Sequence, residues 1–326
     1  MAGPYDLQGP LLPPKDAGAG SVGAHGSDCA RFTIVRAEAR FAAALRATLA
    51  EPGCYIGVVP YATTPLSIHY RDLGEGDPVV LIQGLGLSSR FWFDIPERVA
   101  SLGFRVLAPD NRGTGESALP KRPFGMASFA ADIARVLDAA GVESAFVAGV
   151  SMGGMIAQNF ALLHPHRVRG MVLMATTPGM PAGRIPPLGT LGKLVTMPLR
   201  RGPDASRALA TLLLAPEALP RARELLADWP AAAAADGPRP KTFAAHLGAI
   251  ATHRAAKRLH TLRCPVHVMT GESDVLVPPQ NSEILARLIP GATLERLAGT
   301  GHAITAGDRD VVGRALERVR ARARPV

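Results

Sequence analysis

The stretch Val147-Ala148-Gly149-Val150-Ser151-Met152-Gly153-Gly154 decides the predicted fold of this chain. Residues 144–150 form a short apolar run that is typical of a buried strand, and the run breaks at Ser151. A helical spacing of apolar residues follows at once, with Met155, Ile156, Phe160 and Leu163. The pattern therefore predicts a strand, a tight turn that exposes the serine, and a helix.

Ser151 has the neighbours that a nucleophilic serine requires. A serine hydroxyl is a weak nucleophile, so it must be held out from the chain and beside a base. A tight strand-to-helix turn does this only if the residues two positions away are small, and here they are Gly149 and Gly153. The same turn directs the backbone N–H of Met152 and the N-terminus of the helix toward one point, where negative charge develops during acyl transfer. Ser151 is therefore the candidate nucleophile.

A candidate acid and a candidate base each follow a predicted strand later in the chain, as a Ser-His-Asp triad needs. The strand 266–270 leads into a loop with Asp274, and the strand 292–297 leads into a glycine-rich segment that ends at His302. An acid just past a strand lies at the rim where open α/β sheets bind their ligands. Glu272 is the alternative acid, but it lies closer to the strand end, so Asp274 is preferred. The chain order of nucleophile, acid and base is the order expected for this kind of sheet.

With these motifs in this order, the chain resembles the α/β-hydrolase superfamily over residues 65–320. Residues 79–86 are similar to the family's first long strand and its oxyanion loop, and residues 106–117 are similar to its D-x-R-G-x-G-x-S turn. The resemblance implies that the backbone N–H of Leu85 is the second oxyanion donor. Many relatives have His-Gly where this chain has Gln83 followed by glycine, so the role of Gln83 stays open.

From residue 66 onward, strand and helix patterns alternate. This alternation predicts an α/β protein with a mostly parallel central sheet flanked by helices, the architecture of the α/β-hydrolase fold. The expected strands are 67–71, 79–83, 105–109, 145–150, 170–175, 266–270 and 292–297. The expected helices are 91–102, 128–140, 152–164, 280–288 and 309–321. Residues 31–51 suggest one further helix, and residues 1–30, rich in glycine, proline and alanine, suggest a flexible leader.

The alternation fails between residues 177 and 262, where prolines separate helical fragments. In the superfamily that the chain resembles, an insertion at this place forms a cap over the active site, so the resemblance implies a helical cap here. The expected organisation is a leader at 1–30, a first part of the hydrolase core at 31–176, a cap at 177–262 and a second part of the core at 263–326. The leucines of the cap would line an aliphatic pocket or pack on the core.

The composition argues against several classes of protein. The chain has 326 residues, of which 47% are hydrophobic. No apolar run reaches the length of about 20 residues that a membrane helix needs, and the N-terminus lacks a secretory pattern. Three scattered cysteines indicate neither a disulfide framework nor a zinc site. The charge of +9 is dispersed and only 5% of residues are aromatic, so nucleic-acid binding is not indicated. We expect a cytoplasmic protein that acts on a small molecule without metal, cofactor, nucleic acid or membrane. Its oligomeric state stays open.

The residues predict a serine hydrolase that cleaves a carboxylic ester or lactone of a hydrophobic small molecule through an acyl-enzyme. A haloalkane dehalogenase of this fold would need an aspartate at Ser151, and an epoxide hydrolase would also need tyrosines in the cap, whereas all four tyrosines precede it. Carbon–carbon bond hydrolases, thioesterases and cofactor-free haloperoxidases or perhydrolases use the same three residues and stay open as alternatives. A catalytically silent ligand-binding protein is a further alternative, although every triad candidate is present.

Overall fold

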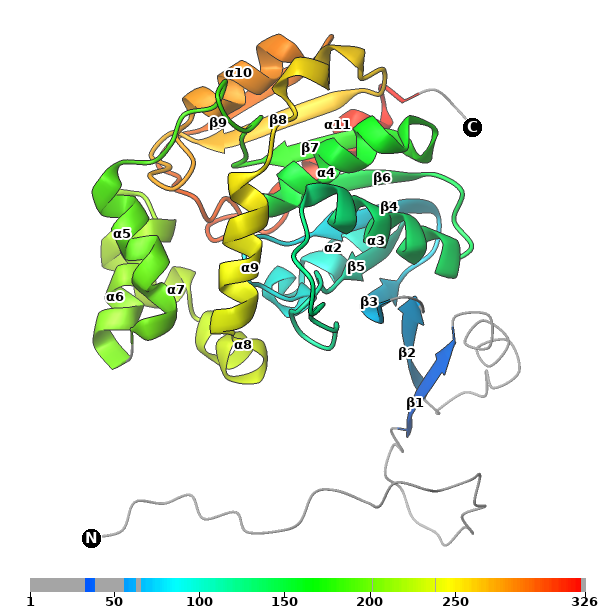
Figure 1. Ribbon diagram of the computed structural model, residues 1–326, viewed down its shortest axis with the longest axis horizontal. Helices are drawn as coiled ribbons and strands as arrows, with labels where there is room; N and C mark the ends of the chain where they lie inside the picture. The colour runs from blue at the N-terminus through cyan, green and yellow to red at the C-terminus, as the bar shows by residue number, and fades with distance from the viewer. Residues whose placement is uncertain (1–32, 39–55, 63–65, 201, 238, 324–326) are drawn as a thin grey trace, which may run out of the picture.

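A mostly parallel sheet runs through the computed structural model (Figure 1). The structure describes residues 33–38, 56–62, 66–200, 202–237 and 239–323, the first two of these ranges as backbone alone. The strands are β1 (Thr33–Glu38), β2 (Ile56–Ala62), β3 (Ile68–Leu73), β4 (Asp77–Ile82), β5 (Phe104–Pro109), β6 (Ala145–Val150), β7 (Val168–Met174), β8 (Val266–Gly271) and β9 (Thr293–Leu297). Their order in the sheet is β1-β2-β3-β5-β4-β6-β7-β8-β9.

The strands from β5 across to β9 are parallel, and β3 is antiparallel to both of its neighbours. Because parallel strands all end at the same edge of a sheet, the loops after β4, β6, β8 and β9 emerge together. These are the loops that carry the predicted site residues. The parallel arrangement therefore gathers residues from distant parts of the sequence at one edge.

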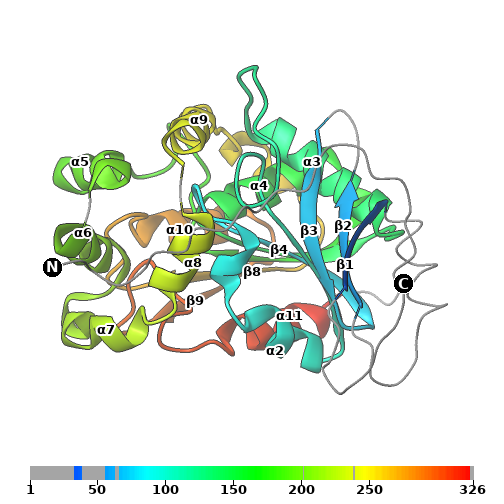
Figure 2. The same cartoon turned by 90° about the horizontal axis from the view of Figure 1, so that it is seen from below.

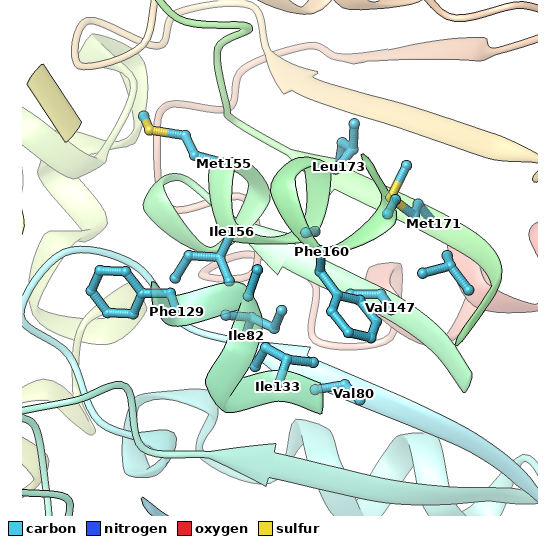
Figure 3. Close-up of a cluster of buried hydrophobic side chains, with 14 of the residues drawn as sticks. Val80, Ile82, Phe129, Ile133, Val147, Met155, Ile156, Phe160, Met171 and Leu173 are labelled. Atoms are coloured by element: carbon cyan, nitrogen blue, oxygen red, sulfur yellow. The ribbon is translucent and has the colours of Figure 1, made fainter. Parts of the chain in front are cut away.

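Helices cover both faces of the sheet, as Figure 2 shows. They are α2 (Ile95–Ser101), α3 (Met126–Ala139), α4 (Met152–Leu163), α10 (Gln280–Leu288) and α11 (Val311–Arg320). Alternate residues of a strand point to opposite faces, so Val80 and Ile82 of β4 pack with α3 and α4, whereas Val79 and Leu81 pack with α2 and α11. Figure 3 shows the first of these clusters. Both faces of the central strands are thus buried, and these strands read as continuous apolar runs.

Between β7 and β8 the described chain is helical. It contains α5 (Leu188–Thr196), α6 (Gly202–Leu213), α7 (Ala222–Leu225), α8 (Trp229–Asp236) and α9 (Pro240–Ala251), with the short 3-10 turns Met197–Leu199, Pro216–Arg221 and Ala256–Thr261. We call residues 177–262 the helical segment. Figures 1 and 2 show α5, α6 and α7 grouped beyond the end toward which β7 and β8 run. The helical segment therefore lies on the same side as the site loops.

Two local expectations were wrong in part. The helix expected over 91–102 is a 3-10 turn, Ser89–Trp92, followed by α2, because Phe93 adopts a φ of 55° that no α-helix contains. The helix expected over 31–51 is also wrong at its start, since residues 33–38 form β1. Its run Thr33-Ile34-Val35 is β-branched, and β1 finds a parallel partner in β2, which no local pattern reveals. The remainder, 39–55, and the leader 1–30 lie outside the described residues.

Candidate active site

Ser151 lies in the one-residue turn between β6 and α4 and has a strained backbone. Its φ is 55° and its ψ is −118°, a conformation that residues with a side chain rarely adopt. Two hydrogen bonds hold the turn: the Ser151 N–H donates to the Met174 carbonyl over 2.8 Å, and the Thr176 hydroxyl donates to the Ser151 carbonyl over 2.7 Å. The turn stands at the carboxyl edge of the sheet and leaves the serine partly exposed. This is the geometry that the sequence motif predicts.

The glycines on either side of Ser151 are required by close backbone packing. A Cβ at Gly149 would overlap the carbonyl group of Gly153, and a Cβ at Gly153 would overlap the carbonyl oxygen of Ile82 in β4. Backbone atoms cannot give way as a flexible side chain can. The smallness of these two residues therefore allows α4 to start directly over β4 and β6.

Replacing Gly153 with alanine is expected to lower the free energy of unfolding by about 3 kcal/mol, because the added methyl group meets backbone in a packed core. Urea unfolding followed by circular dichroism measures the change. Gly248→Ala is the matched control, because a Cβ there meets no atom within 4 Å and α9 gains a better helix former. Equal stability of the two variants would contradict the packing argument.

Asp274 and His302 are brought together by the loops that follow β8 and β9. His302 Nδ1 lies 2.8 Å from Asp274 Oδ2, and the Asp274 side chain is fully buried. The other carboxylate oxygen, Oδ1, accepts the backbone N–H groups of Leu276 and Val277, each over 2.8 Å. Glu272, the alternative acid, is exposed. The structure thus places Asp274 rather than Glu272 against the histidine.

The glycine-rich segment before His302 allows this approach. A Cβ at Gly271, the last residue of β8, would overlap the carbonyl of Gly301, so the loop after β9 passes directly over the end of β8. The Ser273 N–H donates to the Thr300 carbonyl over 3.0 Å and ties the two loops together. The acid and the histidine are therefore fixed relative to one another by backbone contacts as well as by their own hydrogen bond.

The loop after β4 lies against Ser151. A Cβ at Gly84 would stand 3.4 Å from Ser151 Cβ and 3.9 Å from its Oγ. Residues 84–87 form a tight turn in which the Leu87 N–H donates to the Gly84 carbonyl over 3.4 Å and Gly86 takes a φ of 71°. Among the described residues, no protein acceptor receives the N–H of Leu85, which lies in this turn, or the N–H of Met152. We call residues 83–87 the oxyanion loop.

Gln83 shapes the oxyanion loop from within. Its side-chain carbonyl accepts the N–H of Gly84 over 2.9 Å, and its backbone carbonyl accepts the side-chain amide of Asn111 over 2.9 Å. The side chain is nearly buried. Gln83 therefore holds the start of the oxyanion loop in place.

Asp110, in the D-x-R-G-x-G-x-S turn, supports the same region. It accepts a hydrogen bond from His69 Nδ1 over 2.7 Å and the N–H of Ser89 over 2.7 Å. Burial works to raise its pKa, but these bonds and one from the Glu116 N–H outweigh burial and lower it. Asp110 is thus a buried carboxylate that braces the chain after the oxyanion loop. His69 carries no sequence motif, and 41 residues separate it from Asp110, so its part in this brace could not be seen in the sequence.

The helical segment contacts two of the site loops. The Ala303 N–H, next to His302, donates to the Leu213 carbonyl of α6 over 2.9 Å. The ring of Phe91 packs edge-on against Trp229 of α8, with centroids 5.1 Å apart. Both the histidine loop and the chain that follows the oxyanion loop are therefore in contact with the helical segment.

Two buried histidines, one in α9 and one just after it, tie this end of the helical segment to the core. His246 is fully buried, and its Nε2–H donates to the Arg112 carbonyl over 2.9 Å while Nδ1 accepts the Gly86 N–H over 3.2 Å. The Nε2–H of His253 donates to the Thr177 carbonyl over 3.2 Å. Burial lowers the pKa of each histidine from its ordinary value of 6.5 to about 4. Both are neutral in the folded protein near pH 7.

These two histidines make stability fall in mild acid. The unfolded chain takes up their protons near pH 6.5, whereas the folded protein takes them up only near pH 4, so the unfolded state binds more protons between these values. We therefore expect the contribution of these two rings to the free energy of unfolding to be complete above pH 6.5 and to be lost as the pH falls toward 4, by about 3 kcal/mol for each histidine. Urea unfolding at pH 7.0, 5.5 and 4.5 measures this loss. A flat profile would contradict the burial of the neutral rings.

Comparison with known proteins identifies the family. Residues 77–305 match the family described as alpha/beta hydrolase fold. A protein of Azorhizobium caulinodans named "Putative carbamate hydrolase RutD" is 31% identical over 260 residues, which are 79% of this chain and 97% of that protein. The structure of a thermophilic esterase from Thermogutta terrifontis aligns with a TM-score of 0.67 at 25% identity, over 81% of this chain and 97% of its own. Est816, described as an N-acyl homoserine lactone degrading enzyme, aligns with a TM-score of 0.68 at 26% identity, over 79% of this chain and 99% of its own.

The chain belongs to the α/β hydrolase fold family. These relatives carry the names of hydrolases, and the family and the observed sheet agree with the fold class predicted from the sequence. None of the described helices has the length and apolar character needed to cross a membrane. The described residues also hold no group of three or more His, Cys, Asp or Glu side chains arranged to bind a metal ion.

Proposed function

We propose that this protein is a serine hydrolase that cleaves a carboxylic ester or lactone of a hydrophobic small molecule through an acyl-enzyme. The observation that carries the proposal is the combination of a strained, partly exposed Ser151 with a buried Asp274–His302 pair at the same edge of the sheet. Strain of this kind persists where the surrounding structure enforces it, and it collects at functional sites.

The proposed reaction assigns one proton transfer to each step. His302 donates its Nδ1–H to Asp274, which leaves Nε2 as the base. Ser151 gives its hydroxyl proton to Nε2 and attacks the acyl carbon, and the alkoxide of the collapsing intermediate leaves with that proton. Water then repeats the sequence on the acyl-enzyme, regenerating the serine and releasing the acid.

The N–H groups of Leu85 and Met152 would bind the oxyanion in both steps. Each lies next to a residue of the site, Leu85 beside Gly84, which borders Ser151, and Met152 at the start of α4. The positive end of the α4 dipole adds to their effect. One such donor contributes about 3 kcal/mol to lowering the barrier.

We further propose that the helical segment acts as the cap that the sequence predicts. Its contacts with the loops of His302 and Phe91 support this role. An apolar cluster joins the helical segment to the loops that carry the acid and the histidine, and it includes Leu213, Leu214, Trp229, Leu276 and Ala303. This cluster places apolar side chains of the helical segment next to the site loops, and on this basis we propose a hydrophobic acyl substrate rather than a charged one.

A carbamate is the second candidate substrate, because the relative from Azorhizobium caulinodans is named as a carbamate hydrolase. The alignment with this chain covers nearly the whole length of that relative. A carbamate, like an ester, has a carbonyl carbon that a serine can attack, so the roles of Ser151, His302 and Asp274 would not change. The two candidates differ in the group attached to that carbon. A comparison of the turnover rates of an ester and a carbamate therefore separates them.

Stopped-flow hydrolysis of p-nitrophenyl acetate, butyrate, octanoate and dodecanoate tests the proposal, with a p-nitrophenyl carbamate and a γ-lactone run in parallel. We expect a burst of nitrophenolate that matches the enzyme concentration, and a preference for an intermediate chain length. Faster turnover of the carbamate would favour the second candidate. Absence of ester and lactone hydrolysis by a folded protein would overturn the proposal.

A further inference from the structure

His246 of α9 reaches from the helical segment to the oxyanion loop, 160 residues away in the chain. Its Nδ1 accepts the Gly86 N–H over 3.2 Å. Its Nε2–H donates to a backbone carbonyl, so Nδ1 carries no proton and can only accept. The hydrogen bond to the Arg112 carbonyl thus fixes the tautomer of the ring. That tautomer makes Nδ1 the acceptor of the Gly86 N–H.

The ring of His246 is held rigidly. The side chains of Phe124 and Phe129 pack edge-on against it, with centroids 6.2 and 5.2 Å away. The Arg112 guanidinium stacks on both phenyl rings and forms a buried ion pair with Asp132 over 2.8 Å. The acceptor that receives the Gly86 N–H is therefore fixed by α3 and by the D-x-R-G-x-G-x-S turn.

The oxyanion loop is thereby held on both sides of Leu85. Before Leu85, the Gly84 N–H is bound by Gln83, and after it, the Gly86 N–H is bound by His246. Gly86 has a φ of 71°, a region that glycine enters about as readily as negative φ, so its backbone is conformationally permissive. The hydrogen bond to His246 supplies the restraint that the glycine backbone lacks.

We propose that His246 is a positioning residue that orients the Leu85 N–H for oxyanion binding through its hydrogen bond to Gly86. This inference rests on the proposed function, because it assigns the Leu85 N–H to the oxyanion. His246 does not touch the substrate. It acts through the oxyanion loop. Because His246 belongs to α9, the catalytic rate depends on α9 keeping its place against that loop.

Two substitutions separate this role from a purely structural one. In His246→Asn the side-chain oxygen can take the place of Nδ1 and still accept the Gly86 N–H, while the bond to Arg112 is lost. In His246→Gln the side-chain amide can take the place of Nε2 and still donate to Arg112, while the Gly86 N–H loses its acceptor. Each variant therefore breaks one of the two hydrogen bonds.

We expect His246→Gln to lower kcat on p-nitrophenyl butyrate about 10-fold to 100-fold with KM within about twofold of wild type, because the transition state loses a well-placed donor. His246→Asn should keep kcat within about threefold of wild type. Binding of a trifluoromethyl ketone analogue, which forms the oxyanion, should weaken in the Gln variant by the factor lost from kcat/KM. Equal kcat values for the two variants, or a slower Asn variant, would overturn the proposal.

Controls distinguish this inference from the proposed function. His253→Asn and His253→Gln alter an equally buried ring that contacts Asn159 and Thr177 and not the oxyanion loop, so they should lower stability and keep kcat. A folded wild type without Ser151-dependent turnover would overturn the inference together with the proposed function. Should both His246 variants fail to fold, NMR of the wild type decides the matter: a nitrogen–nitrogen coupling across the Gly86 N–H and His246 Nδ1 supports the proposal, and its absence overturns it.

Discussion

Ser151→Ala is expected to lower kcat on p-nitrophenyl butyrate about 10⁴-fold or more and to leave the fold intact. The loss is large because the alanine has no oxygen to form the acyl-enzyme, and the remaining groups can only assist direct attack by water. The fold should survive because alanine keeps the Cβ and the same turn, whose hydrogen bonds come from backbone atoms and from Thr176. Steady-state kinetics and thermal unfolding measure the two effects.

Ser101→Ala is the matched control for this substitution. Ser101 is exposed at the end of α2, and its hydroxyl donates to the Arg98 carbonyl one turn earlier, so its loss should change neither kcat nor thermal stability appreciably. Normal ester turnover by the Ser151 variant would show that another residue is the nucleophile. A Ser151 variant that fails to fold is replaced by Ser151→Cys, which keeps a side chain of similar size and changes the nucleophile.

Asp274→Asn is expected to lower kcat about 10³-fold to 10⁴-fold, and the geometry explains why. The N–H groups of Leu276 and Val277 both point at Oδ1, so the amide of asparagine must place its oxygen there and its NH₂ group toward His302. His302 Nδ1 then has to accept, and the ring proton moves to Nε2. A ring protonated at Nε2 cannot take the proton of Ser151.

Glu272→Gln is the control for the acid, because Glu272 follows the same strand and is exposed. It should keep full activity, and His302 should retain a proton on Nδ1 that NMR detects in the wild type and not in the Asp274 variant. Full activity of Asp274→Asn together with an inactive Glu272→Gln would show that the acid is misassigned.

The sequence predicts the Ser151 turn and the Asp274–His302 pair because each depends on local signals. A serine between apolar runs, with a glycine two residues before it and another two residues after it, specifies a tight turn. The parallel topology places an acid or a histidine that directly follows a strand at the edge of the sheet. These residues also come close together because the strands that carry them, β6, β8 and β9, are neighbours or near neighbours in the sheet.

Other features depend on contacts between distant residues and leave no local pattern. His246 lies in a helix without a motif, and its partner Gly86 is 160 residues away. The residues of β1 are compatible with helix or strand until β2 provides a partner. The break at Phe93 likewise occurs where Phe91 packs against Trp229 of the helical segment, a contact between distant residues that no local pattern reveals.

Covalent labelling of Ser151 tests the central proposal most directly. The wild type is incubated in separate samples with an alkyl fluorophosphonate and with p-nitrophenyl butyrate. Each sample is quenched in acid and analysed by peptide mass spectrometry. We expect a single stoichiometric adduct on the peptide that contains Ser151, with none on Ser151→Ala and slow formation on Asp274→Asn. Ester turnover with no adduct on that peptide, or equal labelling of Ser151→Ala, would contradict the proposed acyl-enzyme mechanism.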